Sequence, residues 1–350
     1  MVDNYNNHKV SIIILNYNAG DLLLNCLNSV FKTSHDDIEV IIVDNASIDN
    51  SHRKCKEKFE KIKLIENKQN LGYCEGNNVG IRAATGEFII ILNPDTIIAP
   101  NCVTELITAY EKYGEALYQP KIISLYEKNI IQSTGNMLHL FGFGFARDKG
   151  VLNSLQRDKI EQIGYASGTC LFVSQKTLKK IGLLDPFLFL YHDDLDLGWR
   201  AAHLGIKSYY VPSSVVYHAE SYSLKWSSKK FFWLERNRRY CLLTHYSTDT
   251  YKKMSTYLWL VEIMVWIFYI SKGFLGAKIK AEKDIMKNKK HILQKRLELE
   301  NKKIVQDIEL IKSFPDEIFV PKNVSGGLGS RIFNSLLRSA SKKAKNKILH

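Results

Sequence analysis

The first hundred residues alternate between short strand-like runs and segments with helical periodicity. The strand-like runs are rich in Ile, Val and Leu and lie at residues 10–15, 39–43, 62–66 and 88–92. Strands without polar alternation are buried on both faces, as in parallel sheets covered by helices. The segments between them, of which 21–31 is the clearest, repeat apolar residues at helical spacing, with Asp21 as the expected N-cap. The pattern predicts an α/β fold with a mostly parallel central sheet and helices on both faces.

The positive charge is concentrated in the last hundred residues. Residues 251–350 hold 21 Lys and Arg against 9 Asp and Glu, which leaves +12 of the chain's net +13. We therefore expect two parts: a catalytic domain over residues 1–245 and a basic, helical C-terminal appendage over 246–350. Within the appendage, the periodicity predicts a long amphipathic helix over about 278–311.

The six cysteines are scattered and form no Cys-x-x-Cys pair, which fits a reducing compartment. The polar residues 1–7 do not resemble a signal peptide. The longest apolar run, 257–270, is shorter than the roughly 20 residues of a spanning helix and contains Glu262. We expect a cytoplasmic protein whose basic, aromatic C-terminal region associates peripherally with the inner face of the membrane through anionic lipid. The alternative is that this region packs on the catalytic domain or on a second copy, and the oligomeric state stays open.

Polar side chains follow three of the predicted strands. Asn16 follows the first strand, Asp44 and Ser47 the second, and Asn93 and Asp95 the run 88–92. In open α/β sheets, ligands bind at the carboxyl ends of the strands. These residues are therefore expected at one edge of the sheet, around a ligand.

A second polar group lies further along the chain. Asp193, Asp194 and Asp196 fall within four positions, and His218 ends a later apolar run. Neighbouring carboxylates repel one another unless a cation or a proton is shared, so the cluster indicates an active site. Carboxylates and a histidine after separate strands are typical of metal-assisted chemistry. The alternative is structural: Asp193 caps a helix that starts near 195, and His218 is a core histidine.

The order of these motifs is more specific than any one of them. Ser11-Ile-Ile-Ile-Leu-Asn-Tyr-Asn18, Val43-Asp-Asn-Ala-Ser47, Asn70-Leu-Gly72 and Leu92-Asn-Pro-Asp95 come first, and Gly168-Thr-Cys, the acidic triplet and His218 follow. Over residues 9–240 the chain resembles family 2 glycosyltransferases of the GT-A fold, especially the rhamnosyltransferase-like branch of bacterial surface-polysaccharide enzymes. The resemblance implies an inverting transferase with a nucleotide-sugar donor and a lipid-linked or oligosaccharide acceptor.

The resemblance also implies a divalent metal, Mn²⁺ or Mg²⁺, at the donor diphosphate. Asp95 matches the last acid of the family's Asp-x-Asp motif, and His218 matches a histidine that completes the metal site in several relatives. Asn93 stands where that motif has its first acid, so one carboxylate is missing. Oxygen ligands on a hard cation suit a leaving diphosphate.

Roles for the acidic triplet follow from the same resemblance. Asp194 matches the catalytic base that deprotonates the acceptor hydroxyl. Asp193 would support the site, and Asp196 would orient the loop or hold acceptor hydroxyls.

The donor nucleotide is expected beside Asp44, which matches the residue that hydrogen-bonds the nucleobase. A carboxylate acceptor suits a pyrimidine imide, which favours a UDP- or dTDP-linked sugar. The remaining residues expected to bind the donor are Asn16, Ser47, Asn70, Gly72, Asn77, Asn78 and Asn93.

Three other interpretations compete with rhamnosyl transfer. A galactofuranosyl- or N-acetylhexosaminyltransferase would use the same residues, and a non-catalytic scaffold would keep the fold. A nucleic-acid-binding protein would explain the basic tail, but that charge lies outside the ordered motifs and no nucleic-acid-binding module is recognisable. We therefore expect no nucleic-acid partner.

Overall fold

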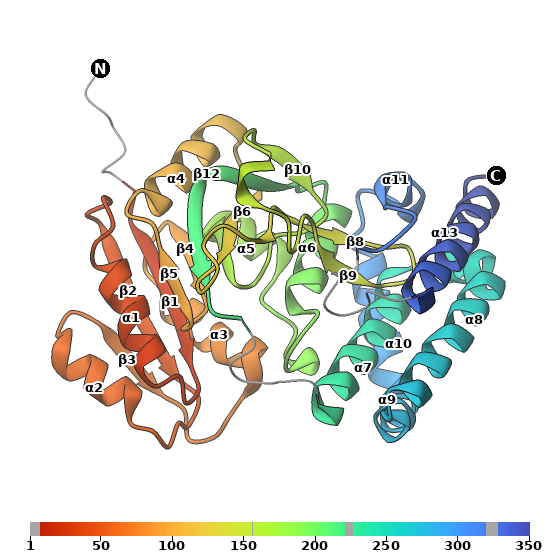
Figure 1. The fold of residues 1–350 in the computed structure, drawn as a ribbon, viewed down its shortest axis with the longest axis horizontal. Coiled ribbons are helices and arrows are strands. Elements are labelled where there is room, and N and C mark those ends of the chain that lie inside the picture. Colours follow the sequence, from red (N-terminus) through yellow and green to blue (C-terminus); the bar gives the residue numbers. More distant parts are fainter. Residues whose placement is uncertain (1–7, 156, 221–226, 320–327) are drawn as a thin grey trace. The chain divides into compact units, whose positions relative to one another are not determined.

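The computed structural model describes residues 8–155, 157–220, 227–319 and 328–350 (Figure 1). The prediction that no signal peptide is present concerns residues 1–7, which lie outside the described residues. By spatial contacts the chain divides into two compact units. Unit 1 comprises residues 1–136, 146–198 and 206–222, and unit 2 comprises 137–145, 199–205 and 223–350.

Unit 1 is built on one central sheet with the order β10-β12-β6-β11-β4-β1-β2-β3, with β5 beside β12 and β7 beside β6. Strands β4, β1, β2 and β3 run parallel, which confirms the predicted parallel core. Beyond β4 the sheet is mixed, because β11 is antiparallel to both β4 and β6. The strands are β1 Val10–Asn16, β2 Ile38–Asp44, β3 Lys63–Glu66, β4 Phe88–Leu92, β5 Thr96–Ile98, β6 Leu117–Ser124, β7 Ile131–Ser133, β10 Glu161–Ile163, β11 Cys170–Ser174 and β12 Ser208–His218.

Helices cover both faces of this sheet, as predicted (Figure 1). Ile12 and Ile14 of β1 belong to a buried cluster with α1 and α4. The other face of β1 meets α3 at close range, since a Cβ on Gly80 would lie 2.4 Å from Ile13 Cγ2. The helices of unit 1 are α1 Asp21–Val30, α2 Ser51–Lys58, α3 Gly72–Ala83, α4 Cys102–Tyr113 and α5 Gln175–Ile181, and α6 Asp193–His203 starts in this unit.

Several local expectations are corrected. The N-cap of α1 is Gly20, at a φ of 56°, so Asp21 is the first helical residue. In the segment 136–146, which carried no strand prediction, β9 Gly144–Ala146 pairs with β8 Asn136–Leu138. The expected helix 278–311 is three helices, broken at Asn288 and again between 300 and 307.

Unit 2 is mainly helical and holds α7 Ser228–His245, α8 Thr248–Ser271, α9 Leu275–Lys287, α10 Lys289–Glu300, α11 Asp307–Ser313 and α13 Leu328–Leu349. Its centre is a charged cluster. Lys278 Nζ, fully buried, lies 2.5 Å from Glu235, 2.9 Å from Glu262 and 2.6 Å from Glu282. Arg238 completes the cluster by pairing with Glu235 at 2.8 Å. These ion pairs join α7 to α8 and α9, so α7 lies in the same compact unit as the C-terminal helices. The domain boundary expected at residue 245 stays a prediction.

Candidate active site

The loops that follow β1, β2 and the segment before α6 form the polar edge of unit 1. Their backbone is unusual: non-glycine residues adopt positive φ at Asn18 (53°), Ala46 (61°), Tyr191 (68°) and His192 (62°). Such conformations cost free energy and persist where the surrounding structure fixes them, often at functional sites.

Asp44 organises the part of this edge where the nucleotide is expected. It is 2% exposed. Its Oδ1 accepts from Asn16 Nδ2 at 2.7 Å and lies 3.1 Å from His52 Nδ1. Its Oδ2 accepts from the Ser47 amide at 2.9 Å. A carboxylate offers about four acceptor positions, so this network leaves Oδ2 one position for a ligand donor.

The segment from Asn70 to Asn78 is held by hydrogen bonds within the protein. Asn70 Oδ1 accepts from the Gly72 amide at 2.8 Å. Gly72 has a φ of 78°, and a Cβ there would lie 2.5 Å from the Phe189 ring. The absence of a side chain at Gly72 therefore allows Phe189 to pack against its backbone. Asn77 donates to Tyr73 O at 2.9 Å, and Asn78 exchanges hydrogen bonds of 2.8 and 3.0 Å with the Leu184 backbone.

Asn77 and Asn78 are 0% and 1% exposed. The donor-binding role expected for Asn77 and Asn78 stays a prediction: Asn78 is bonded to Leu184, whereas Asn77 Oδ1 has no hydrogen-bond partner within the described residues. Their observed role is to fix α3 and the segment around Leu184.

Asp95 and His218 meet because β5 pairs with β12, with Thr96 opposite His218. Asp95 Oδ2 lies 3.3 Å from His218 Nε2. Gln132 in β7 holds the other side of the imidazole: its Nε2 donates to His218 O at 2.9 Å and its Oε1 lies 2.8 Å from His218 Nδ1. A carbonyl only accepts, so the Gln132 amide nitrogen faces it and Oε1 accepts from Nδ1–H. In the neutral ring, the Nε2 lone pair then faces Asp95.

The acidic triplet lies in the first turn of α6, where the helix dipole favours negative charge. Asp196 is fully buried and Asp193 is 6% exposed, whereas Asp194 is half-buried and is the most accessible of the three. Asp194 Oδ2 accepts from the Gly168 amide at 3.1 Å, and Oδ1 accepts from Leu195 N at 2.8 Å.

Gly168 and Thr169 connect the two groups of acids. Thr169 O accepts from the Asn93 amide at 3.0 Å, while the neighbouring Gly168 amide donates to Asp194. Tyr73 adds a third tie, since its hydroxyl donates to Gly168 O at 2.6 Å. Thus Asn93, two residues before Asp95, and Asp194 are joined through one dipeptide.

Burial raises the pKa values of the acids at this centre. Burial, and next the charge of Asp194, raise the pKa of Asp193 well above its usual range. Burial also raises the pKa of Asp194, against hydrogen bonds from Gly168 and Leu195 that lower it. Both carboxyls are therefore harder to ionise than an exposed Asp.

The raised pKa of Asp193 predicts a pH-dependent gain in stability for the variant Asp193→Asn. A carboxyl whose pKa is raised by folding destabilises the native state as pH rises from its unfolded value towards its folded value. We expect the variant to have a higher Tm than the wild type at neutral pH. The gain should disappear below the ordinary Asp value of 3.8, where both forms are uncharged. Thermal unfolding from pH 3 to 8 measures it, and an equal gain at every pH would contradict the assignment.

Four participants were not anticipated from sequence: His52, Tyr73, Gln132 and the Gly168 amide. Gly168 carried a signal as part of the Gly-Thr-Cys motif, and Tyr73 directly follows the Asn70-Leu-Gly72 motif. His52 and Gln132 are ordinary residues in their local context.

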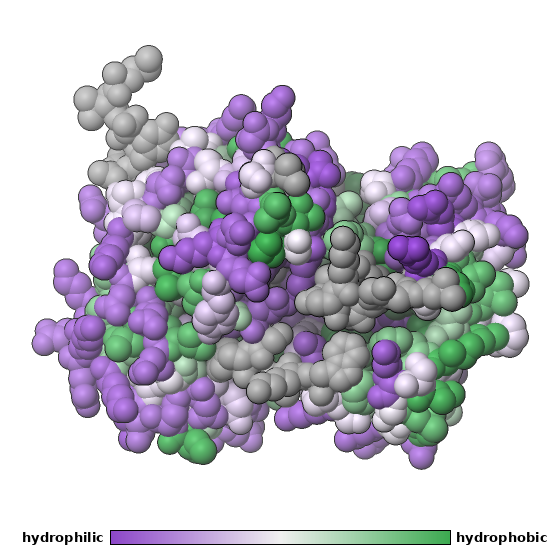
Figure 2. Space-filling model, in the orientation of Figure 1, coloured by the Kyte–Doolittle hydropathy of each residue, from purple (hydrophilic) through white to green (hydrophobic). Residues whose placement is uncertain are grey.

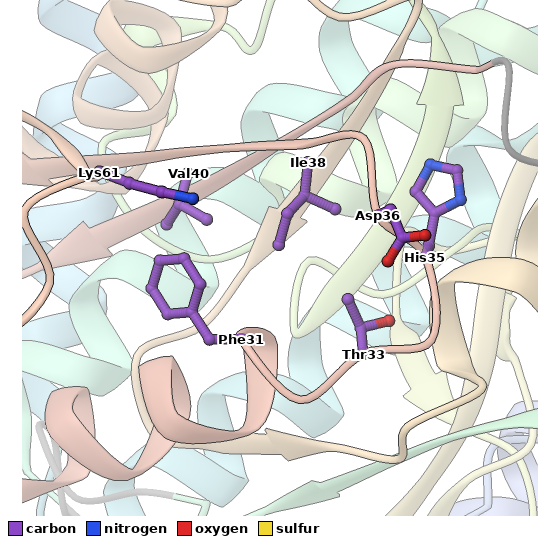
Figure 3. A pocket seen from close by; sticks show the side chains of 7 residues that line it. All are labelled: Phe31, Thr33, His35, Asp36, Ile38, Val40 and Lys61. Carbon is purple, nitrogen blue, oxygen red and sulfur yellow. The ribbon is translucent and has the colours of Figure 1, made fainter.

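A hollow of about 210 Å³ lies elsewhere in unit 1 (Figure 3). It adjoins the start of β2 and so the amino-terminal edge of the strands, opposite the acids described above. It is lined by Phe31, Thr33, His35, Asp36, Ile38, Val40 and Lys61. We therefore do not assign it to the candidate active site.

Comparison with known proteins links this geometry to one family. Residues 11–182 match the model of glycosyl transferase family 2. The low-salt glycan biosynthesis hexosyltransferase of Haloferax volcanii is 27% identical over 198 residues, which cover 55% of this chain and 61% of the relative. The N-acetylglucosaminyl-diphospho-decaprenol L-rhamnosyltransferase of Mycobacterium tuberculosis is 25% identical over 235 residues, or 61% of this chain and 76% of the relative. The chain thus spans less than two thirds of the first of these relatives.

Solved structures share the fold. GalNAc-T7 with UDP, GalNAc and Mn²⁺ superposes with a TM-score of 0.61 at 16% identity, covering 80% of this chain and 57% of that one. S. aureus TarS gives a TM-score of 0.51 at 17% identity, covering 97% and 55%. At these identities the likeness concerns the fold.

Proposed function

Because this chain belongs to glycosyltransferase family 2, we propose that it is an inverting, metal-dependent transferase that moves a sugar from a nucleotide donor to a glycan acceptor. The observation that carries the proposal is the tie through Gly168 and Thr169, which joins Asp194 to the Asn93–Asp95 segment. A base for the acceptor and ligands for the donor diphosphate are both needed in one site, and this tie supports their common placement.

In the proposed reaction, Asp194 accepts the proton of an acceptor hydroxyl as that oxygen bonds to the anomeric carbon. The bond from the anomeric carbon to the diphosphate oxygen breaks, and its electron pair leaves with the nucleoside diphosphate. Asp194 suits this role because it is more accessible than Asp193, and because its raised pKa makes the carboxylate a stronger base than an exposed Asp. Asp196, fully buried, would stabilise the start of α6.

Asp95 and His218 fit a divalent cation, since a carboxylate oxygen and an imidazole nitrogen lie 3.3 Å apart with Gln132 directing the ring. The neighbour GalNAc-T7 was solved with Mn²⁺. A bound cation would neutralise charge that develops on the departing diphosphate.

Gln132 is then a positioning residue for the metal site. Outer partners of a ligating histidine fix its tautomer and orientation, and their loss costs about 10- to 100-fold in metal affinity. We expect Gln132→Leu to weaken Mn²⁺ binding by about this factor without unfolding the chain, measured by electron paramagnetic resonance of free Mn²⁺. Gln162→Leu, at an exposed position of β10, is the control. Unchanged affinity in Gln132→Leu would remove this role.

For the donor we propose a UDP- or dTDP-linked hexose such as rhamnose, with the pyrimidine beside Asp44, Asn16 and Ser47. The one open acceptor position of Asp44 matches a single imide N–H. Galactofuranose or an N-acetylhexosamine would use the same site. For the acceptor we propose a lipid-linked glycan of cell-surface polysaccharide synthesis, met at the cytoplasmic face of the membrane. A relative whose name contains a diphospho-decaprenol acceptor supports this class.

The test is a thermal-shift screen of UDP-, dTDP- and GDP-sugars, each with and without Mn²⁺ or Mg²⁺. A ligand that binds only the folded state raises Tm by mass action. Stabilisation by one nucleotide class that requires the metal supports the proposal and identifies the donor class. No shift with any of them would favour a non-catalytic scaffold.

A further inference from the structure

We propose that the outward face of α8 docks on the surface of an anionic lipid bilayer, with the helix lying in the plane of the membrane. Helix α8 is apolar on two faces. One faces the interior of unit 2 through Met254, Leu258, Val261, Val265 and Tyr269. The other, here called the outer stripe, consists of Trp259 (64% exposed), Leu260 (46%), Ile263 (37%), Ile267 (60%) and Ile270 (56%).

The outer stripe is a continuous surface. Trp259 and Leu260 are adjacent, and Ile263, Ile267 and Ile270 follow at spacings of three or four residues, so the five side chains share one side of the helix. Figure 2 shows hydrophobic surface over α8. A helix that is apolar all round needs cover on both sides, and a contiguous exposed apolar patch on a folded protein marks an interaction site.

Positive charge borders the outer stripe. Lys252 and Lys272, near the two ends of α8, are exposed. Helix α13 packs along α8, where Lys253 Nζ donates to Ile348 O at 3.5 Å, and α13 exposes Lys342, Lys343 and Lys347. An apolar stripe with flanking lysines is the pattern of helices that lie in an anionic membrane interface.

The charge pattern also indicates which partner covers the outer stripe. A second copy docked through the same stripe would bring two sets of lysines together, and like charges across an interface oppose association. Anionic lipid headgroups would instead pair with these lysines while the acyl region covers the stripe.

A transmembrane orientation is disfavoured by the inner side of α8. By length and composition alone, Thr248–Ser271 could cross a membrane, with a mean hydropathy of 1.4. Glu262 on this helix, however, pairs with Arg238 and, at 2.9 Å, with Lys278. Burial opposes its ionisation, but Arg238, Arg239 and Lys278 lower the pKa of Glu262 to about 2. Crossing the bilayer would separate this charge from its partners, which is costly in hydrocarbon.

The test is co-sedimentation of the full chain with vesicles of phosphatidylcholine alone or with phosphatidylglycerol. We expect binding to the anionic vesicles that weakens as NaCl is added. Trp259→Ser/Ile267→Ser should lower the partition coefficient at least about tenfold. Lys342→Glu/Lys343→Glu should reduce binding to anionic vesicles. Ile304→Ser, 73% exposed between α10 and α11, is the matched control and should bind as the wild type does.

Three outcomes would overturn the inference. They are no binding of the wild type to anionic vesicles, unchanged binding of the stripe variant, and a stripe variant whose main effect is to turn a dimer into a monomer in size-exclusion chromatography. The inference deepens the proposed function, since a lipid-linked acceptor would be met at such a surface. Its failure is distinguishable because vesicle binding needs no sugar donor, and donor-induced thermal shifts of the same variants report separately on the candidate active site.

Discussion

Replacing Asp194 with Asn is expected to lower sugar transfer by about 100- to 10,000-fold while donor affinity stays within about twofold of wild type. The loss is the usual contribution of a general base. Donor affinity should persist because Asp194 faces the acceptor hydroxyl in the proposed reaction, and Asn keeps one side-chain oxygen that can still accept from either the Gly168 or the Leu195 amide. Initial rates and calorimetric titration of the donor measure the two quantities.

The same assignment fixes the direction of the pH dependence. Burial raises the pKa of Asp194, so kcat/KM should fall as the pH drops through this raised value. Asp158→Asn, at an exposed position in unit 1, is the control and should leave both rate and affinity unchanged. An equal loss of donor binding in Asp194→Asn would contradict its role as base.

Replacing Asp95 with Ala should abolish the metal-dependent part of donor binding and lower transfer by at least about 100-fold. Electrostatic stabilisation by a bound cation is worth several kcal/mol, and about 2.7 kcal/mol corresponds to a factor of 100. Asp95 Oδ2 and His218 Nε2, which lie 3.3 Å apart, are the two protein ligands we propose, so the variant would lose one of them. Mn²⁺ titration with UDP present, followed by electron paramagnetic resonance, measures this effect without turnover.

Asn93→Asp is the informative companion to that variant. Asn93 is partly exposed and stands where the family's motif carries its first acid. The variant should tighten Mn²⁺ binding, because it supplies a second carboxylate to a hard cation. If Asn93→Asp leaves Mn²⁺ affinity unchanged while Asp95→Ala also has no effect, the metal does not bind at this place.

Much of unit 1 could be predicted from sequence because its information is local. Strands β1, β2 and β4 each contain four or five consecutive apolar residues, and the burial of these runs requires a sheet covered on both faces. Polar residues that directly follow such strands are placed at the carboxyl edge by chain connectivity alone. Asp44 and Asp95 were found in this way.

The rest depends on contacts between distant positions. Helix α3 begins at Gly72, where the Phe189 carbonyl accepts from Tyr73 N at 2.6 Å at the first turn. The region 118–168 has weak periodicity because its short strands, β7 and β10 among them, each hold three residues. The predicted helix 278–311 has the right composition, yet it breaks where Ile304 and Val305 amides donate to His203 O.

The sequence by itself determined the fold class, and it predicted the edge of the sheet where a ligand is expected and Asp95, Asp194 and His218 as candidate site residues. Tertiary structure alone decided that Gln132, 86 positions away, directs the His218 ring, that Tyr73 reaches Gly168, and that Asn77 and Asn78 are buried. It also decided that one side of α8 is left uncovered. The reason is physical: hydrophobic periodicity reports which face of an element is buried, whereas hydrogen bonds between side chains depend on which elements the folded chain brings together.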